Sequence, residues 1–107
     1  MQIRAAQPND FCFELAELIW SEHPTLAAFE YGTVTDLHHF MTKEWPAPGV
    51  GNSFDAAHVA IEDSKIIGFM SGWPETELKP RYAATDALHR PGLTPEENAE
   101  IDEMIQN

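Results

Sequence analysis

Basic residues, cysteine and long apolar runs are scarce in this chain of 107 residues. Six lysines and arginines stand against eighteen aspartates and glutamates, so the formal net charge is −12. A field of that sign repels phosphate backbones and anionic membranes, and we therefore expect no nucleic-acid partner. No apolar run approaches the ~18 residues that suggest a membrane span. The N-terminus lacks the charged segment and apolar core of a secretory signal. We expect a cytoplasmic protein that does not enter the membrane.

Metal and disulfide chemistry have few candidate residues. Cys12 is the only cysteine, which excludes an intrachain disulfide and a zinc site built on several cysteines. It lies in a helical apolar pattern and is expected to be a small core residue. The adjacent His38 and His39 would point about 100° apart on a helix and would not converge on one metal ion. No metal site is predicted.

Residues 57–73 carry the two-residue apolar period that is typical of strands. Two runs of this kind, joined by Asp63 and Ser64, predict a β-hairpin with a two-residue connection. Serine is an unfavourable choice here, because a type I′ turn needs positive φ and usually has glycine as its second residue.

Two glycines interrupt the second strand of this hairpin. Gly68 and Gly72 are expected on the face shared with Ile66 and Met70. Glycine inside a strand indicates a bulge or close approach to the backbone. The approaching group would be a ligand or a helix lying across the strand.

Helical patterns and their boundary signals account for most of the remaining chain. The turn at 8–10 is expected to supply an N-cap, Thr33 a second one, and Thr94 with Glu97 a capping box. Gly32 is expected to close the second helix. The expected elements are a strand at 2–6, helices at 11–21, 25–31, 34–44, 75–90 and 95–107, and a loop at 46–55.

This order predicts a single α+β domain over residues 1–107. A chain of this length buries about 60–70% of its unfolded surface, which is sufficient for one core. We expect a short, mostly antiparallel sheet of about three strands packed with helices over residues 1–74. Residues 75–107 are expected to form a C-terminal helical segment, with Ile101, Met104 and Ile105 as the apolar side of its last helix.

Two stretches resemble one enzyme family. IRAAQPND followed by FCFELAELIW resembles the opening strand and helix of the GCN5-related N-acetyltransferases (GNAT family). HVAIEDSKIIGFMSG resembles their second and third strands. The resemblance covers about the first 75 residues, the N-terminal half of the family's fold. It implies acetyl-CoA as the cofactor and transfer of an acetyl group to an amine as the activity.

The family's phosphate-binding loop is missing from this chain. That loop has the pattern Q/R-x-x-G-x-G/A, because glycine lets the backbone N–H groups approach the pyrophosphate. Arg90 begins the nearest match, but Leu93 stands where the first glycine belongs. We therefore expect the N-terminal portion of an acetyltransferase-like protein, either a partial reading frame or a stand-alone half-domain. It would not be competent alone and would bind no cofactor alone, and no catalytic residue is assigned.

Four residues between the predicted helices at 11–21 and 34–44 are candidates for the acceptor side. They are Glu22, His23, Glu30 and Tyr31. In the enzymes that this chain resembles, the segment often borders the acceptor amine. The carboxylates would hold an ammonium group, and His23 would move a proton. The alternative is a solvated loop with Tyr31 folded onto the core.

Trp73 is the candidate interface residue. It lies at the end of the hairpin, beside a sheet edge that the predicted elements leave unpaired, and such an edge invites a partner. The expected partner is a second copy of the chain or a chain that supplies the missing half. The alternative function is accordingly a small acidic homodimeric association module without catalysis.

Overall fold

The protein has an α+β fold, as predicted. The computed structural model describes residues 1–106, and within them the side chains of residues 1–103. Four short 3-10 turns lie between the helices and strands. In chain order the helices and strands are β1 (Gln2–Ala5), α1 (Phe13–Glu22), α2 (Pro24–Tyr31), α3 (Val34–Glu44), β2 (Ala57–Glu62), β3 (Lys65–Ser71), α4 (Leu78–His89) and α5 (Pro95–Gln106).

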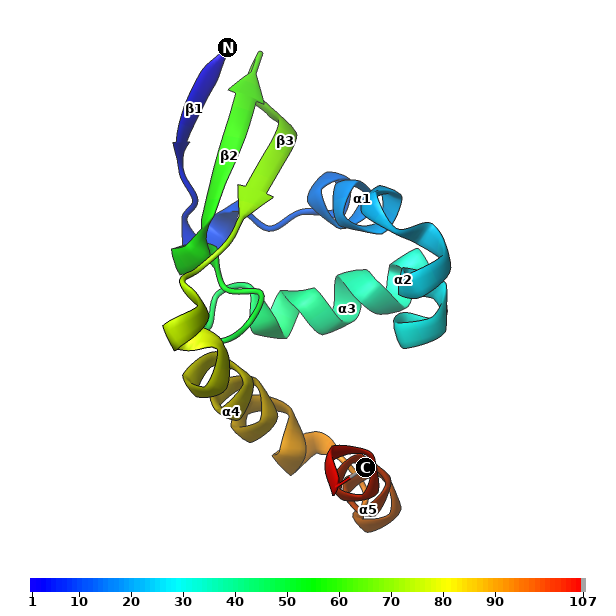
Figure 1. The fold of residues 1–107 in the computed structure, drawn as a ribbon. Coiled ribbons are helices and arrows are strands. Elements are labelled where there is room, and N and C mark those ends of the chain that lie inside the picture. The colour runs from blue at the N-terminus through cyan, green and yellow to red at the C-terminus, as the bar shows by residue number, and fades with distance from the viewer. Residues whose placement is uncertain (107) are drawn as a thin grey trace.

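The three strands form one antiparallel sheet in the order β1-β2-β3. Helix α1 packs against β3 and α3, so these two helices lie on one side of the sheet (Figure 1). The centre of the core joins α1, α3 and β2 through Leu15, Leu37 and Val59, which are fully buried. Cys12 packs against this core as predicted, and its burial raises the pKa of the thiol. Burial of these apolar side chains is the main force that holds the helices on the sheet.

The prediction that the turn at 8–10 caps α1 is wrong. The Asp10 carboxylate instead accepts hydrogen bonds from Arg4, at 2.7 and 2.8 Å, and from the Gln7 backbone N–H. The hydrogen bonds from Arg4 lower the pKa of Asp10 most. With Asp10 engaged in this pair, α1 begins at Phe13 and its N-cap residue Cys12 makes no side-chain cap.

The boundaries of α2 and α3 agree with the sequence signals. Gly32 ends α2 with φ 93°, a left-handed conformation that glycine adopts without strain. Thr33 caps α3, and its hydroxyl accepts a hydrogen bond from the Asp36 N–H while the Asp36 carboxylate accepts one from the Thr33 N–H. This reciprocal capping box fixes where α3 starts.

The predicted hairpin is confirmed. Asp63 and Ser64 connect β2 to β3, and both have left-handed φ angles, 51° and 64°. These angles are those of a type I′ turn, in which a non-glycine residue is strained.

We expect Ser64→Gly to raise the free energy of unfolding by about 0.5–1 kcal/mol, because glycine removes the strain at this turn position. Chemical denaturation measures the change. Ser71→Gly is the matched control, since Ser71 is not among the positive-φ residues and glycine there is expected to destabilise. Equal effects of the two substitutions would contradict the assignment of strain to Ser64.

Neither Gly68 in β3 nor Gly72, which follows the strand, makes room for a helix. A Cβ at Gly68 would meet only Ala60, at an ordinary 3.7 Å, and one at Gly72 would meet nothing. The ladder shifts by one residue between Ala60 and Ile61, which leaves Ile67 as the extra residue of a bulge next to Gly68. Because of this bulge, Ile66 packs on the core while Met70 is exposed, so the prediction that they share a face is wrong.

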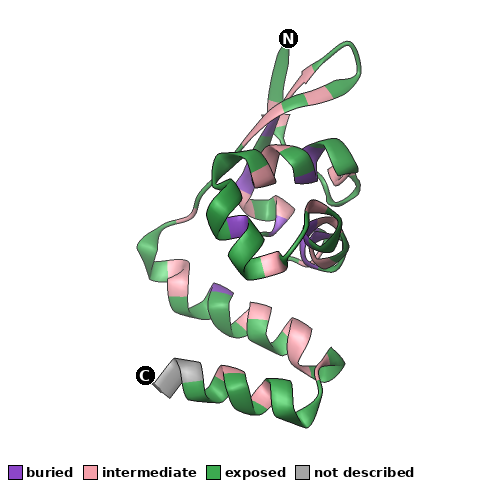
Figure 2. Cartoon of the chain, turned by 90° about the vertical axis from the view of Figure 1, so that its right-hand side faces the viewer, coloured by how far each residue is buried: buried purple, intermediate pink, exposed green. Residues whose placement is uncertain are grey.

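The C-terminal helices form a pair at one end of the molecule (Figure 2). The radius of gyration is 14.7 Å, against about 13 Å for a compact domain of about 100 residues, and the longest extent is 46 Å. Thr94 and Glu97 form the predicted capping box at the start of α5. Ile101 is half-buried, whereas Met104 and Ile105 lie outside the residues whose side chains are described. None of the helices in residues 1–106 has the length and apolar character needed to cross a membrane.

Candidate functional site: an aromatic and acidic cleft

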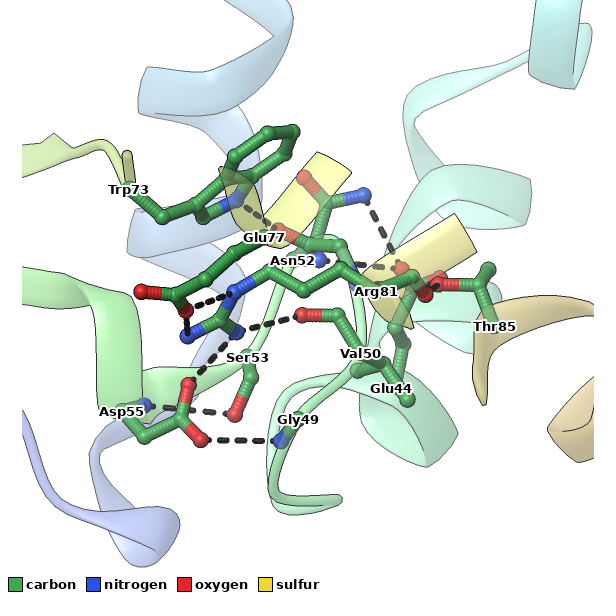
Figure 3. Close-up of polar contacts among 11 residues, drawn as sticks. Glu44, Gly49, Val50, Asn52, Ser53, Asp55, Trp73, Glu77, Arg81 and Thr85 are labelled. Carbon is green, nitrogen blue, oxygen red and sulfur yellow. Dashed lines mark hydrogen bonds and ion pairs between the residues drawn. The ribbon is translucent and has the colours of Figure 1, made fainter. Parts of the chain in front are cut away.

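Arg81 fastens α4 to the loop that precedes β2 (Figure 3). The residue is only 8% exposed. Its Nη1 donates hydrogen bonds to the Val50 carbonyl at 2.9 Å and to the Asp55 carboxylate at 2.8 Å. Its Nε and Nη2 contact the Glu77 carboxylate at 3.0 and 2.9 Å. Arg81 is the only buried residue of α4, so contacts of this one cation hold the helix in place.

The Asp55 carboxylate is held in its ionised form. Partial burial alone would raise its pKa, but hydrogen bonds from Arg81, from the Gly49 N–H and from Ser53 outweigh that effect and lower the pKa. In return, the hydrogen bond to Asp55 is the largest cause of the raised pKa of Arg81. The pair thus stabilises the docked position of α4 at neutral pH.

Glu44 is the second polar centre, and it is only 1% exposed. One carboxylate oxygen accepts hydrogen bonds from the backbone and side-chain amides of Asn52, at 3.1 and 3.2 Å. The other oxygen lies 3.1 Å from Nε2 of His89. Glu44 therefore joins three segments, the end of α3, the loop at 46–53 and the end of α4. A buried carboxylate is tolerated when it is paired in this way.

Two further hydrogen bonds complete the floor of the site. The Gly51 N–H donates to Thr85 Oγ1 at 2.8 Å, and the Gly51 carbonyl accepts from the Trp73 indole N–H at 3.2 Å. The Trp73 ring meets Tyr82 edge-on, with 6.2 Å between centroids. The loop, the end of the hairpin and α4 consequently have defined positions relative to one another.

A cleft of about 340 Å³ opens over this floor. Its walls combine carboxylates and aromatic rings, an arrangement that favours organic cations. It continues into a wider depression of about 820 Å³ that shares Glu30, Tyr31 and Phe40 and also contains His89 and Lys43. The residues that line the narrower cleft are Glu30, Tyr31, Phe40, Glu44, Gly51, Asn52, Trp73, Tyr82 and Thr85.

The pKa of Tyr31 depends on its burial and on the charges that surround the cleft. Its burial, followed by repulsion from Glu30 and Glu44, raises the pKa of the phenol to about 12. Repulsion of a phenolate by both carboxylates means that the potential at the phenol is negative. The ring packs on Phe40 at 5.3 Å between centroids, and Phe40 in turn stacks on His89 at 4.2 Å. The aromatic wall is thus continuous.

The structure brings together some of the residues predicted from the sequence and separates others. Glu30 and Tyr31 line the cleft. Glu22 and His23 lie at the junction of α1 and α2 and line a different hollow with Leu26 and other residues of α2. The predicted group of four is therefore split into two pairs.

Trp73 lies in the same cleft as Glu30 and Tyr31, although it was singled out as an interface residue. Its indole is half-buried and is engaged by Gly51, Tyr82 and Arg81, whose guanidinium carbon lies 6.0 Å from the ring centroid. In this structure it contributes an aromatic wall. Its role as an interface residue stays a prediction.

Sequence reasoning missed Glu44 and His89, although a signal was present for the first. Leu37, Met41 and Glu44 have the i, i+4, i+7 spacing of one helix face, and the first two are buried core residues. An acidic residue on such an apolar stripe must find a partner inside the protein. Nothing in the local sequence indicated that this partner would be His89, which lies 45 positions further along.

Acetyl-CoA, which the family resemblance implies, does not fit the residues of this chain. Its pyrophosphate would need free backbone N–H groups at a helix start and nearby positive charge. The helix that follows β3 is preceded by the turn Glu75–Glu77, which carries two carboxylates. The arginines are paired with acids: Arg4 with Asp10, Arg81 with Asp55 and Glu77, and Arg90 with Asp86 and Asp102.

Compared with the known protein families, the curated proteins and the solved structures, this chain shows no match. The resemblance to acetyltransferases is therefore confined to the two sequence stretches, and none of these comparisons identifies a family for the chain. The cleft is described by its own geometry and chemistry.

Proposed function

We propose that this chain is the acceptor half of an acetyltransferase-like protein, which holds a cationic amine in the cleft and does not bind acetyl-CoA by itself. The observation that carries the proposal is the convergence of Glu30, Glu44 and Tyr31 with three other aromatic side chains in one cleft of about 340 Å³. The resemblance of the first 75 residues to the N-acetyltransferases supplies the functional class. The residues that line the cleft indicate the kind of ligand, a cationic amine.

An ammonium group suits this cleft for two physical reasons. The negative potential at Tyr31 attracts a cation. This attraction is stronger in the partly desolvated cleft than in bulk water, because water screens charges more strongly. The rings of Phe40, Trp73 and Tyr82 offer additional cation–π or apolar contact to the carbon skeleton of the amine. Glu30 is exposed, so its carboxylate is available to an incoming ligand.

A titration with benzylammonium tests the proposal, with benzyl alcohol as the uncharged control. We expect saturable binding of the ammonium compound and none of the alcohol by calorimetry. Glu30→Gln is expected to weaken binding about tenfold, the loss of one charge-assisted contact. Glu17→Gln is the matched control, because Glu17 is exposed on α1 and does not line the cleft. Equal binding of alcohol and ammonium would overturn the amine assignment.

The titration of Tyr31 gives a second readout at the cleft itself. The Tyr31 phenol is expected to ionise at about pH 12, and bound benzyltrimethylammonium, a quaternary cation that keeps its charge at that pH, is expected to lower that pKa because it favours the phenolate. The ultraviolet absorbance of tyrosinate follows the change, and Tyr31→Phe identifies its source. An unchanged titration at saturating benzyltrimethylammonium would place the cation elsewhere.

Acetyl-CoA is the third ligand to test. We expect no heat of binding to the chain alone, because the sequence lacks the glycine-containing loop with which the family binds the pyrophosphate. Saturable binding would contradict this part of the proposal and leave the amine site standing. A homodimeric association module remains the second candidate function, and the open edge of β3 favours it.

A further inference from the structure

A second hollow adjoins the cleft of about 340 Å³ in which the amine is proposed to bind. It has a volume of about 750 Å³ and is lined by residues of α3, α4 and α5 and of the segment that joins the last two helices. Phe40, Tyr82 and Thr85 line both spaces, so one ligand can occupy the two together. We call this second space the apolar hollow. Its remaining lining residues are Ala83, Asp86, His89, Leu93 and Ile101.

The polar side chains of the apolar hollow already have partners. Apart from Tyr82 there are three of them, and each takes part in a hydrogen bond or an ion pair: Asp86 with Arg90, His89 with Glu44, and Thr85 with the Gly51 N–H. A ligand in the hollow therefore meets no charge that lacks a partner. The contacts that remain for it are with hydrocarbon, from Phe40, Ala83, Leu93 and Ile101.

Much of this apolar surface stays in contact with water. Leu93 and Ile101 are only half-buried, Ala83 is exposed, and Tyr82 is 61% exposed. Removal of apolar surface from water favours binding roughly in proportion to the area covered. A hydrocarbon group that entered the hollow would cover part of each of these side chains.

The cleft and the apolar hollow differ in charge. Glu30 and Glu44 line the cleft but not the hollow, and the raised pKa of Tyr31 reports a negative potential at the cleft end. A ligand that suits both spaces therefore has a cationic group at one end and a hydrocarbon group at the other. A fatty acid would fit the hollow equally well, but its carboxylate would be repelled at the cleft.

We infer that the amine held by this chain is a long-chain alkylamine, whose ammonium group lies in the cleft and whose hydrocarbon chain lies in the apolar hollow. The inference rests on the amine-binding function proposed above and names the class of its substrate. The volumes agree with it. The cleft, at about 340 Å³, suits the head group and its first carbons, and the hollow, at about 750 Å³, accommodates the rest of the chain.

A series of alkylammonium ions tests the inference by calorimetry. From butylammonium through hexylammonium to octylammonium, we expect the affinity to rise about two- to fourfold for each added methylene, because each buried methylene contributes a similar increment. Octanol and octanoate are the controls of equal chain length. Each is expected to bind at least about tenfold more weakly than octylammonium, because neither brings a cation to the carboxylates.

Two variants locate the hydrocarbon chain. Ile101→Ser is expected to reduce the gain per methylene to below about twofold and to leave butylammonium binding unchanged, because Ile101 lines the hollow and not the cleft. Leu88→Ser is its matched control, since Leu88 is also half-buried but lines neither space.

Ala83→Gln repeats the test with a substitution that the helix tolerates, because alanine and glutamine are both good helix formers and Ala83 is exposed. A polar side chain in the path of the hydrocarbon is expected to reduce the gain per methylene again. Ala87→Gln is the matched control, since Ala87 is exposed on the same helix and does not line the hollow.

The outcomes separate the inference from the proposed function. If neither benzylammonium nor butylammonium binds, both are overturned. If butylammonium binds and octylammonium binds no more tightly, or octanol binds as tightly as octylammonium, only the inference is overturned. Equal effects of Ile101→Ser and Leu88→Ser on the gain per methylene would also overturn it, because the hydrocarbon chain would then lie outside the hollow.

Discussion

Replacement of Glu44 by alanine is expected to destabilise the fold by about 3 kcal/mol, because it leaves several buried hydrogen-bonding groups without their partner. The Asn52 amides and His89 would lose their acceptor in a site that water enters poorly. The substitution would also leave a cavity where the side chain packs. Chemical denaturation followed by tryptophan fluorescence measures the loss.

Glu44→Gln separates hydrogen bonding from charge. Glutamine keeps the volume and an acceptor for the Asn52 amides, so the expected loss is smaller, about 1 kcal/mol. Glu14→Ala is the control for a surface carboxylate, since Glu14 is exposed on α1. If Glu44→Ala were as mild as Glu14→Ala, the carboxylate would not be holding the three segments together.

Arg81→Met is expected to cost about 2–3 kcal/mol, somewhat less than Glu44→Ala because Asp55 and Glu77 are partly exposed and can be rehydrated. The loss is expected to be local. Helix α4 would detach from the loop at 46–53 while the sheet keeps its core, and amide hydrogen exchange would rise in residues 78–103 first. Arg90→Met is the control, since Arg90 pairs with exposed acids near the end of α4.

The effect of Arg81→Met is expected to depend on pH. The pKa of Asp55 is lower in the folded chain than its ordinary value of about 4. Ionised Asp55 therefore stabilises the fold above the unfolded-state pKa, and this contribution is lost as the pH falls through the folded-state pKa. The stability difference between the unsubstituted chain and Arg81→Met should narrow as Asp55 becomes protonated. A constant difference across that range would show that the Arg81 and Asp55 charges are not coupled.

These two residues also determine the shape of the proposed amine site. Glu44 lies in the cleft, and Arg81 positions Trp73 and α4 at its wall. Loss of benzylammonium binding in Arg81→Met with the fold retained would therefore report a displaced wall. Glu30→Gln disturbs no buried group, so loss of benzylammonium binding in that variant would report the loss of the ligand contact itself.

Local physics accounts for the elements that the sequence predicted correctly. Thr33 and Asp36 satisfy the free N–H groups at a helix start, and they placed α3 at its observed residues. The two-residue period placed β2 and β3, and the short connection at Asp63 and Ser64 fixed them as a hairpin. Each of these signals involves residues within a few positions of one another, which is why the sequence alone reveals them.

The failed predictions involve interactions that the helix and strand signals do not describe. The turn at 8–10 was expected to cap α1, but the carboxylate of Asp10 pairs with Arg4, a stronger partner because both groups are charged. The bulge at Ile67 turned Ile66 and Met70 toward opposite faces of the sheet. No sequence period reveals one extra residue in a strand, since its cost is balanced by packing elsewhere in the fold.

The sequence by itself determined the α+β class, the boundaries of the capped helices, the hairpin and the strongly acidic character, and it selected Glu30 and Tyr31. Only the tertiary structure decided that these two residues share a cleft with Trp73, and that Glu22 and His23 lie elsewhere. It also decided the pairing of Glu44 with His89 and of Arg81 with Asp55. The physical reason is that a buried charge accepts any partner of the right chemistry, and chain folding over tens of residues chooses which partner is present.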